Sequence, residues 1–349
     1  MAENKEKTSE NKLEAVDLNR LVFEMLKELP ERSRNIIIKR FNLDDQNAKT
    51  LDEIGKEYEI TRERVRQIEA EAMIKLKNIS KKYNFDKISD YLKETVENHG
   101  GIMSEEKIIK IFFDNKNFKA NKQIVLFILS LDDKIETLRK TKIYKKIYFY
   151  EKENVLKFKK AIKKIKNYLQ EKNRSASFDE ITELVNKNSV KMIKSYLDAN
   201  KIILENILGE WGCEKWPHIN PKNIKDKAYL SLKKNKEPLH FTKIADEINI
   251  IWTKKKRTNS QTVHNELIKD DRFVLIGRGI YALTEWGYEK GTVLDIIIEI
   301  MSEKNEEMKQ EKIVKEVLAK RQVKENTIIL NLQNRKCFEK SDGKIYRLK

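Results

Sequence analysis

The chain has 349 residues, of which 39% are hydrophobic and 37% are charged, and its 73 basic and 56 acidic side chains give a formal net charge of +17. This length predicts two or three domains, and the positive charge favours a polyanionic partner, although the codon bias of an A+T-rich genome would also enrich lysine. Two widely separated cysteines exclude a disulfide framework.

The sequence also argues against a membrane protein and a metalloprotein. There is no run of about eighteen apolar residues, and residues 1–13 lack the apolar stretch of a signal peptide, so we expect a cytoplasmic protein without a membrane partner. Cys213 and His218 are neighbours, but a zinc site needs about four ligands and this segment offers no second pair. We therefore expect no metal and no cofactor.

Residues 1–19 are polar and charged, which predicts a disordered tail. Further along, proline and glycine are scarce and apolar residues mostly recur at spacings of three and four. This periodicity predicts a mainly α chain with short β segments.

Residues 50–77 have the pattern of a helix-turn-helix. Thr50 and Glu53 form a capping box, which predicts a helix that begins at Leu51. Gly55 falls inside this helix, where glycine costs about 1 kcal/mol relative to alanine. We attribute its presence to a close crossing with the second helix, where a side chain would collide.

The second helix is expected to begin at Arg62, with Thr61 as its cap. At 100° per residue, one apolar stripe faces the first helix, and it contains Val65, Ile68, Ala72 and Leu76. The opposite face carries side chains that can recognise base edges in a major groove, because arginine pairs with guanine, glutamate with the cytosine amino group and glutamine with adenine. The alternative is a solvated face held by ion pairs along the helix.

Three segments of this region, 29–43, 50–55 and 61–70, closely resemble region four of housekeeping bacterial sigma factors, and we assign residues 20–82 to such a domain. The resemblance implies recognition of the minus-thirty-five promoter element and docking on the β-flap of RNA polymerase. It also implies two sets of DNA contacts. The base-reading candidates are Arg62, Glu63, Arg64 and Gln67, and the phosphate contacts are Thr50 and Arg66.

The match also has departures. The family usually has lysine where this chain has Glu71, which should weaken a backbone contact. Ile74 falls on the otherwise exposed side, where we expect it to pack against the following segment. About twenty residues precede the match, so we expect the promoter-melting regions of a complete sigma factor to be absent.

After residue 84 a pattern recurs four times, at intervals of 73, 63 and 69 residues: a helical apolar pair, a second helical stretch, and two β-prone runs around a turn. This order predicts about four tandem winged-helix units, at 84–150, 154–219, 222–288 and 290–349. The alternative is a stack of helical repeats without a role in binding nucleic acid.

The unit at 222–288 resembles the HARE-HTH winged helix through its segments 237–248 and 271–286. Basic residues before its second helical stretch are candidate phosphate contacts, namely Lys254, Lys255, Lys256 and Arg257. A second basic set lies within 139–166 and has twelve members, for which either salt-dependent phosphate binding or a solvated lysine face is expected. Its members are Arg139, Lys140, Lys142, Lys145, Lys146, Lys152, Lys157, Lys159, Lys160, Lys163, Lys164 and Lys166.

These patterns favour a non-enzymatic, sequence-specific transcription regulator that binds double-stranded DNA. The second hypothesis is an accessory protein that docks on RNA polymerase through its sigma-like domain. An enzyme acting on DNA is disfavoured, because the sequence offers no glycine-rich phosphate loop, no metal-ligand cluster and no nucleophile with a base.

Overall fold

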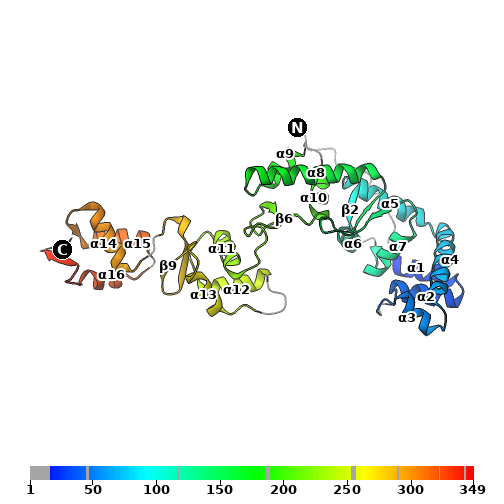
Figure 1. Cartoon of the computed structure of the whole chain (residues 1–349), viewed down its shortest axis with the longest axis horizontal. Helices are drawn as coiled ribbons and strands as arrows, with labels where there is room; N and C mark the ends of the chain where they lie inside the picture. The colour runs from blue at the N-terminus through cyan, green and yellow to red at the C-terminus, as the bar shows by residue number, and fades with distance from the viewer. Residues whose placement is uncertain are drawn as a thin grey trace. The chain divides into compact units, whose positions relative to one another are not determined.

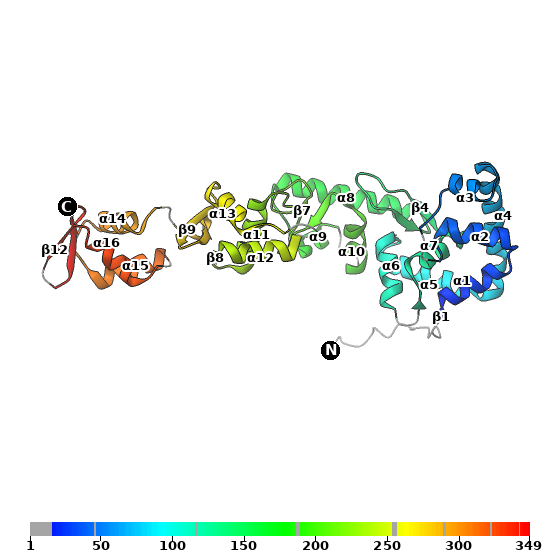
Figure 2. The ribbon, with the colours of Figure 1, turned by 90° about the horizontal axis from the view of Figure 1, so that it is seen from below.

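The computed structural model describes residues 16–44, 47–115, 118–185, 189–252, 257–288, 291–321, 323–341 and 343–349. The chain is mainly helical with small sheets, as its periodicity predicted, and it divides into two compact units, Met1–Leu204 and Glu205–Lys349 (Figures 1 and 2). Among the described residues, no helix combines the length and the apolar character needed to cross a bilayer.

The first unit begins with four helices that contain the expected helix-turn-helix. They are α1 (Leu18–Lys27), α2 (Glu31–Phe41), α3 (Leu51–Glu57) and α4 (Arg62–Ser80). Residues 16–19, which were expected to belong to a disordered tail, form a strand and the start of α1. Strand β1 (Val16–Asp17) precedes α1, the Asp17 carboxylate caps that helix by accepting from the backbone N–H of Arg20, and Leu18 is fully buried.

The next segment adds three helices and a three-stranded antiparallel sheet in the order β2-β5-β4. Its elements are α5 (Phe85–Asn98), β2 (Ile102–Ser104), α6 (Glu105–Asp114), β3 (Phe118–Lys119), α7 (Lys122–Leu131), β4 (Glu136–Leu138) and β5 (Ile147–Phe149). Strand β3 pairs with β1 in parallel, which ties this segment to the start of α1.

The helix-turn-helix and this segment share one hydrophobic core. A single cluster includes buried side chains of α1, α4, α5 and α7, among them Leu18, Leu76, Leu92 and Phe127. The rings of Phe41 and Phe127 meet edge to face with centroids 5.0 Å apart. Residues 20–82 and 84–150 are therefore packed as one body.

The first unit ends with three helices and one strand: α8 (Lys152–Lys172), α9 (Phe178–Leu184), α10 (Val190–Ala199) and β6 (Ile203–Glu205), whose last residue belongs to the second unit. Helix α10 packs on β2, where the Ser195 hydroxyl donates to the carbonyl of Ile102 at 2.8 Å. The Tyr196 hydroxyl donates to the carbonyl of Gly100 at 3.2 Å. The boundary between the two compact units thus falls inside the expected unit 154–219.

The second unit contains two further sets of helices and strands that share the strand order of the β2-β5-β4 sheet, each with a separate core. After β7 (Trp211–Cys213), the first set is α11 (Ile224–Asn235), β8 (Leu239–His240), α12 (Phe241–Trp252), α13 (Ser260–Ile268), β9 (Phe273–Gly277) and β10 (Ile280–Leu283). The second set is α14 (Val293–Lys304), β11 (Met308–Lys309), α15 (Gln310–Lys320), α16 (Glu325–Leu332), β12 (Phe338–Ser341) and β13 (Ile345–Leu348). In both sets the first strand pairs with the last, giving the orders β8-β10-β9 and β11-β13-β12.

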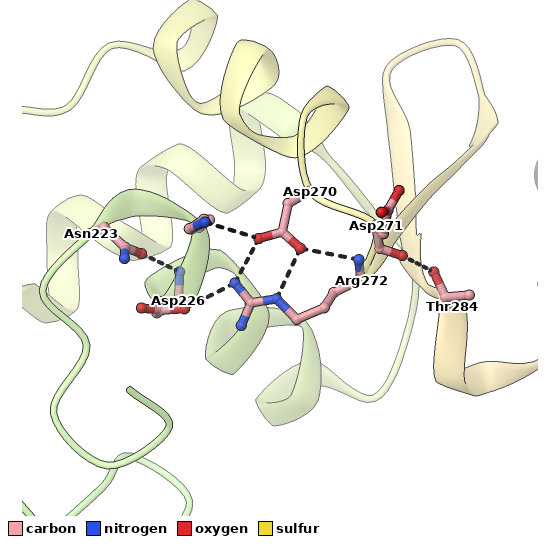
Figure 3. A network of polar contacts seen from close by, with 7 residues as sticks. Asn223, Asp226, Asp270, Asp271, Arg272 and Thr284 are labelled. Carbon is pink, nitrogen blue, oxygen red and sulfur yellow. Dashed lines mark hydrogen bonds and ion pairs between the residues drawn. The ribbon is translucent and has the colours of Figure 1, made fainter. Parts of the chain in front are cut away.

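A polar network fastens the start of α11 to the segment before β9 (Figure 3). The Arg272 guanidinium donates to Asp226 at 2.9 Å and, through two nitrogens, to Asp270 at 2.8 and 3.0 Å. Asn223 caps α11 by accepting from the backbone N–H of Asp226 at 2.8 Å. These hydrogen bonds from Arg272 hold the pKa of Asp270 at about 2, well below its usual range.

Candidate nucleic-acid interface

Helix α3 begins as the capping box predicted. The Thr50 hydroxyl accepts from the backbone N–H of Glu53 at 3.3 Å, and the Glu53 carboxylate accepts from the backbone N–H of Thr50 at 2.7 Å. Ile54 is fully buried on the inner side of the helix, and Leu51 and Tyr58 are partly buried beside it. The short helix is thus fixed at its first turn and along one face.

Gly55 allows a close approach of two backbone segments, as the sequence suggested. A side chain at this position would collide mainly with the turn rather than with the second helix. A Cβ atom at Gly55 would lie 2.7 Å from the carbonyl oxygen of Ile60 and 3.5 Å from the backbone nitrogen of Arg62. The backbone N–H of Ile60 donates to the carbonyl of Gly55 at 2.9 Å, and Glu59 adopts the left-handed conformation with φ of 53°. The turn therefore folds back directly onto α3.

Helix α4 has the orientation that the apolar stripe predicted. The Thr61 hydroxyl accepts from the backbone N–H of Arg64 at 3.1 Å and caps the helix. All four stripe residues are buried: Val65, Ile68, Ala72 and Leu76. Val65 and Ile68 pack with α2 and α3, whereas Ala72 and Leu76 belong to the core shared with α7.

The predicted contact residues of the helix-turn-helix are all exposed: Thr50, Arg62, Glu63, Arg64, Arg66 and Gln67. The turn and the start of α4 border an open depression of about 680 Å³, whose lining includes Lys56, Arg62 and Arg64. Asp52 also lines it and lies 3.9 Å from the Arg62 guanidinium. The charged lining is thus mixed, because Asp52 and Glu59 lie among the three cationic side chains.

Several of these side chains pair with each other along α4. The Arg66 guanidinium donates to both Glu63 carboxylate oxygens, at 2.6 and 2.9 Å, and this holds the pKa of Glu63 below its usual range. Arg64 donates to the Gln67 side-chain oxygen at 3.2 Å. Contacts of this kind are expected of a solvated helix face, so DNA contact by these residues would have to break or reorient these pairs.

The remaining residues that the sequence singled out are the basic run before α13 and Ile74. Lys254, Lys255 and Lys256 lie outside the described residues, and Arg257 is exposed between α12 and α13. The expected packing of Ile74 is wrong, because 63% of this residue is exposed. The segment after α4 turns away through a short 3₁₀ helix (Lys81–Tyr83) and a left-handed residue, Asn84.

The packing role of α7 was not predicted from the sequence. This helix is apolar on nearly every side, with buried Ile124, Val125, Phe127, Ile128, Leu129 and Leu131. It packs against α1 and α4, and an ion pair between Lys77 and Asp133 closes the same contact. A helix apolar all round must be buried, so α7 cannot enter a groove of DNA.

The corresponding helix of the second unit, α13, differs from α7 because it exposes polar side chains, namely Gln261, Thr262 and Asn265.

Comparison with known proteins agrees with this geometry. The family model described as sigma-70, region 4 matches residues 25–78, which run from within α1 almost to the end of α4. Residues 25–78 are a sigma-70 region 4 domain. The region 4 domain thus accounts for the helix-turn-helix and not for the helices that follow it.

Relatives of the region 4 domain include RNA polymerase sigma factors. The chain is 44% identical over 75 residues to RNA polymerase sigma factor SigA of Clostridium acetobutylicum, covering 22% of this chain and 19% of that protein. It is 46% identical over 67 residues to SigA of a Bacillus species (17% and 18%), and 41% identical over 63 residues to the principal sigma factor HrdD of Streptomyces viridifaciens (18% and 19%). The chain therefore spans less than a fifth of the length of these relatives.

Proposed function

We propose that this protein is a transcription regulator that binds double-stranded DNA in a sequence-specific way, with α4 of the region 4 domain in the major groove of a minus-thirty-five type element. The observation that carries the proposal is the exposed N-terminal half of α4, which presents Arg62, Glu63, Arg64 and Gln67 within a domain matched to sigma factors. Thr50 and Arg66 contact phosphates that flank the recognised bases.

The proposal extends to the segments after the region 4 domain. We assign 84–150, 154–219, 222–288 and 290–349 to winged-helix units, of which 222–288 is similar to HARE-HTH. Three strand orders support this assignment for 84–150, 222–288 and 290–349, because in each the first strand pairs with the last, whereas the strands β6 and β7 of 154–219 form a two-stranded sheet. The exposed third helix α13 favours DNA contact by the unit 222–288, with Lys254, Lys255, Lys256 and Arg257 on phosphates, whereas the buried α7 favours a packing role for 84–150.

Mapping of the DNA fragments bound by the full chain across a bacterial genome tests this function. The proposal predicts a common motif among the bound fragments and its location upstream of transcription starts. Fragments without a shared motif would overturn sequence-specific recognition, even if binding were tight.

A second candidate is an accessory protein that docks on the β-flap of RNA polymerase through the region 4 domain. It is supported by the relatives, which are RNA polymerase sigma factors. Against it stands the packing of α7 on α1 and α4, which leaves less apolar surface of the region 4 domain for a partner. Recovery of core polymerase with the tagged chain after nuclease treatment would favour docking, and its absence would remove this candidate.

A further inference from the structure

Helix α8 carries an unusual concentration of like charge. From Asn154 to Gln170 the sequence contains six lysines and no acidic residue. Five of these lysines are exposed. We call four of them, which lie within two helical turns, the α8 lysine face: Lys159, Lys160, Lys163 and Lys164. Lysines three or four residues apart on a helix repel each other, so this face costs stability in the free chain.

The twelve basic residues of 139–166 differ in whether a carboxylate lies nearby. Four of them are neutralised by nearby carboxylates: Lys145 lies 3.0 Å from Asp198, Lys146 lies 2.6 Å from Glu105, Lys152 lies 3.7 Å from Glu136, and Lys157 lies 3.0 Å from Glu153. In the part of the chain that the structure describes, the α8 lysine face forms no ion pair. Its charge is therefore available to an external anion.

The opposite side of α8 packs against the rest of the first unit. Its apolar residues are buried, and the ring of Phe158 lies 5.0 Å from Tyr144 and 5.4 Å from Tyr196. Helix α8 is thus fixed against both the loop before β5 and α10. A helix that binds a membrane surface needs a free apolar face to insert. Among the described residues of α8, Leu156 is the one large apolar side chain that is exposed, so the helix does not offer such a face.

We infer that the α8 lysine face is a second DNA contact in the first unit, which binds the phosphate backbone of a duplex without regard to sequence. The inference rests on the proposed function. Lys159 and Lys164 are separated by about 7.5 Å along the helix axis, and duplex DNA of that length carries roughly four phosphate charges. Four lysines on a rigid helix match this charge density.

The test compares two quadruple variants of the full chain with the same loss of charge. The α8 variant is K159Q/K160Q/K163Q/K164Q, and the control variant is K27Q/K87Q/K110Q/K122Q, whose lysines are exposed and dispersed over α1, α5, α6 and α7. Fluorescence anisotropy measures binding to a random-sequence duplex over a range of salt concentrations. Circular dichroism checks that both variants keep the helical content of the wild type.

We expect the α8 variant to reduce the slope of log K against log salt by about 3 to 4, since each lost phosphate contact removes about 0.9. The control variant should change the slope by less than about 1. The ratio of affinities for specific and random duplexes should stay the same in the α8 variant, because the face does not read bases.

The inference is overturned if the two variants bind random duplex alike, or if the α8 variant instead loses binding to vesicles of phosphatidylserine and phosphatidylcholine while its DNA binding is unchanged. Sequence preference is measured separately, with a substitution in α4. An unchanged slope together with retained sequence preference would therefore reject the α8 contact and leave the proposed function standing.

Discussion

The carboxylate of Glu63 accepts two hydrogen bonds from the guanidinium of Arg66 one helical turn away, at 2.6 and 2.9 Å. One residue is proposed to read a base and the other to contact a phosphate. In the free chain they neutralise each other, so DNA binding requires the pair to separate or to rotate together. We therefore expect the pair to set part of the balance between sequence-specific and general affinity.

Substitution Glu63→Gln should raise affinity for random duplex, because Arg66 is released and a negative charge near phosphates is lost. The same change should reduce discrimination at one cytosine-containing base pair by roughly tenfold. Competition binding with single-base variants of a selected site measures both effects. As a control, Glu71→Gln removes an equal charge further along α4 and should leave base discrimination unchanged; equal behaviour of the two variants would contradict a reading role for Glu63.

Gly55→Ala should destabilise the helix-turn-helix by about 1–3 kcal/mol, because the added methyl group would lie 2.7 Å from the carbonyl oxygen of Ile60. The backbone of the turn cannot move without disturbing the cap of α4. Hydrogen exchange of the α3 and α4 amides should be faster in this variant. Lys56→Ala, at the exposed neighbour, is the matched control, and equal protection in both variants would argue against a tight turn.

Phe127→Ala should destabilise the first unit by about 3–5 kcal/mol, since this buried ring contacts Phe41 and belongs to the core shared by α1, α4 and α7. Amides of α1 and α7 should lose protection together. Phe113→Ala, at a residue that is 53% exposed, should have little effect. Loss of protection confined to α7 would mean that the region 4 domain is stable without it.

The second unit should lose stability in acid through the Arg272 network. The folded pKa of Asp270, about 2, is lower than its unfolded value, so ionised Asp270 stabilises the fold above the unfolded pKa, and this contribution disappears as the pH falls from about 4 to 2. Arg272→Gln should lower the melting temperature at pH 6 and reduce its fall between pH 4 and 2. Arg347→Gln, which breaks an exposed pair with Glu339, should cause a smaller change.

Local signals in the sequence were sufficient for the helix-turn-helix. The capping box at Thr50, the cap at Thr61 and the stripe from Val65 to Leu76 each depend on residues a few positions apart. The same local patterns indicated the exposed face of α4. Its base-reading and phosphate roles stay predictions, because they depend on a partner.

Long-range packing could not be predicted in the same way. The apolar sequence of α7 indicates burial, but its partner α1 lies about a hundred residues earlier, and nothing local connects them. Ile74 was expected to be covered and is not, because the chain turns away after α4. In α8, the sequence alone could not distinguish lysines that form ion pairs from lysines that do not.

The most direct test of the central claim is the affinity of wild type and Arg64→Ala for a selected duplex, its single-base variants and a random duplex, at one salt concentration. If α4 reads bases, Arg64→Ala relaxes the preference at one base pair by roughly 1–3 kcal/mol and leaves the other positions intact. Equal loss of affinity for the selected and the random duplex would contradict base recognition by this helix.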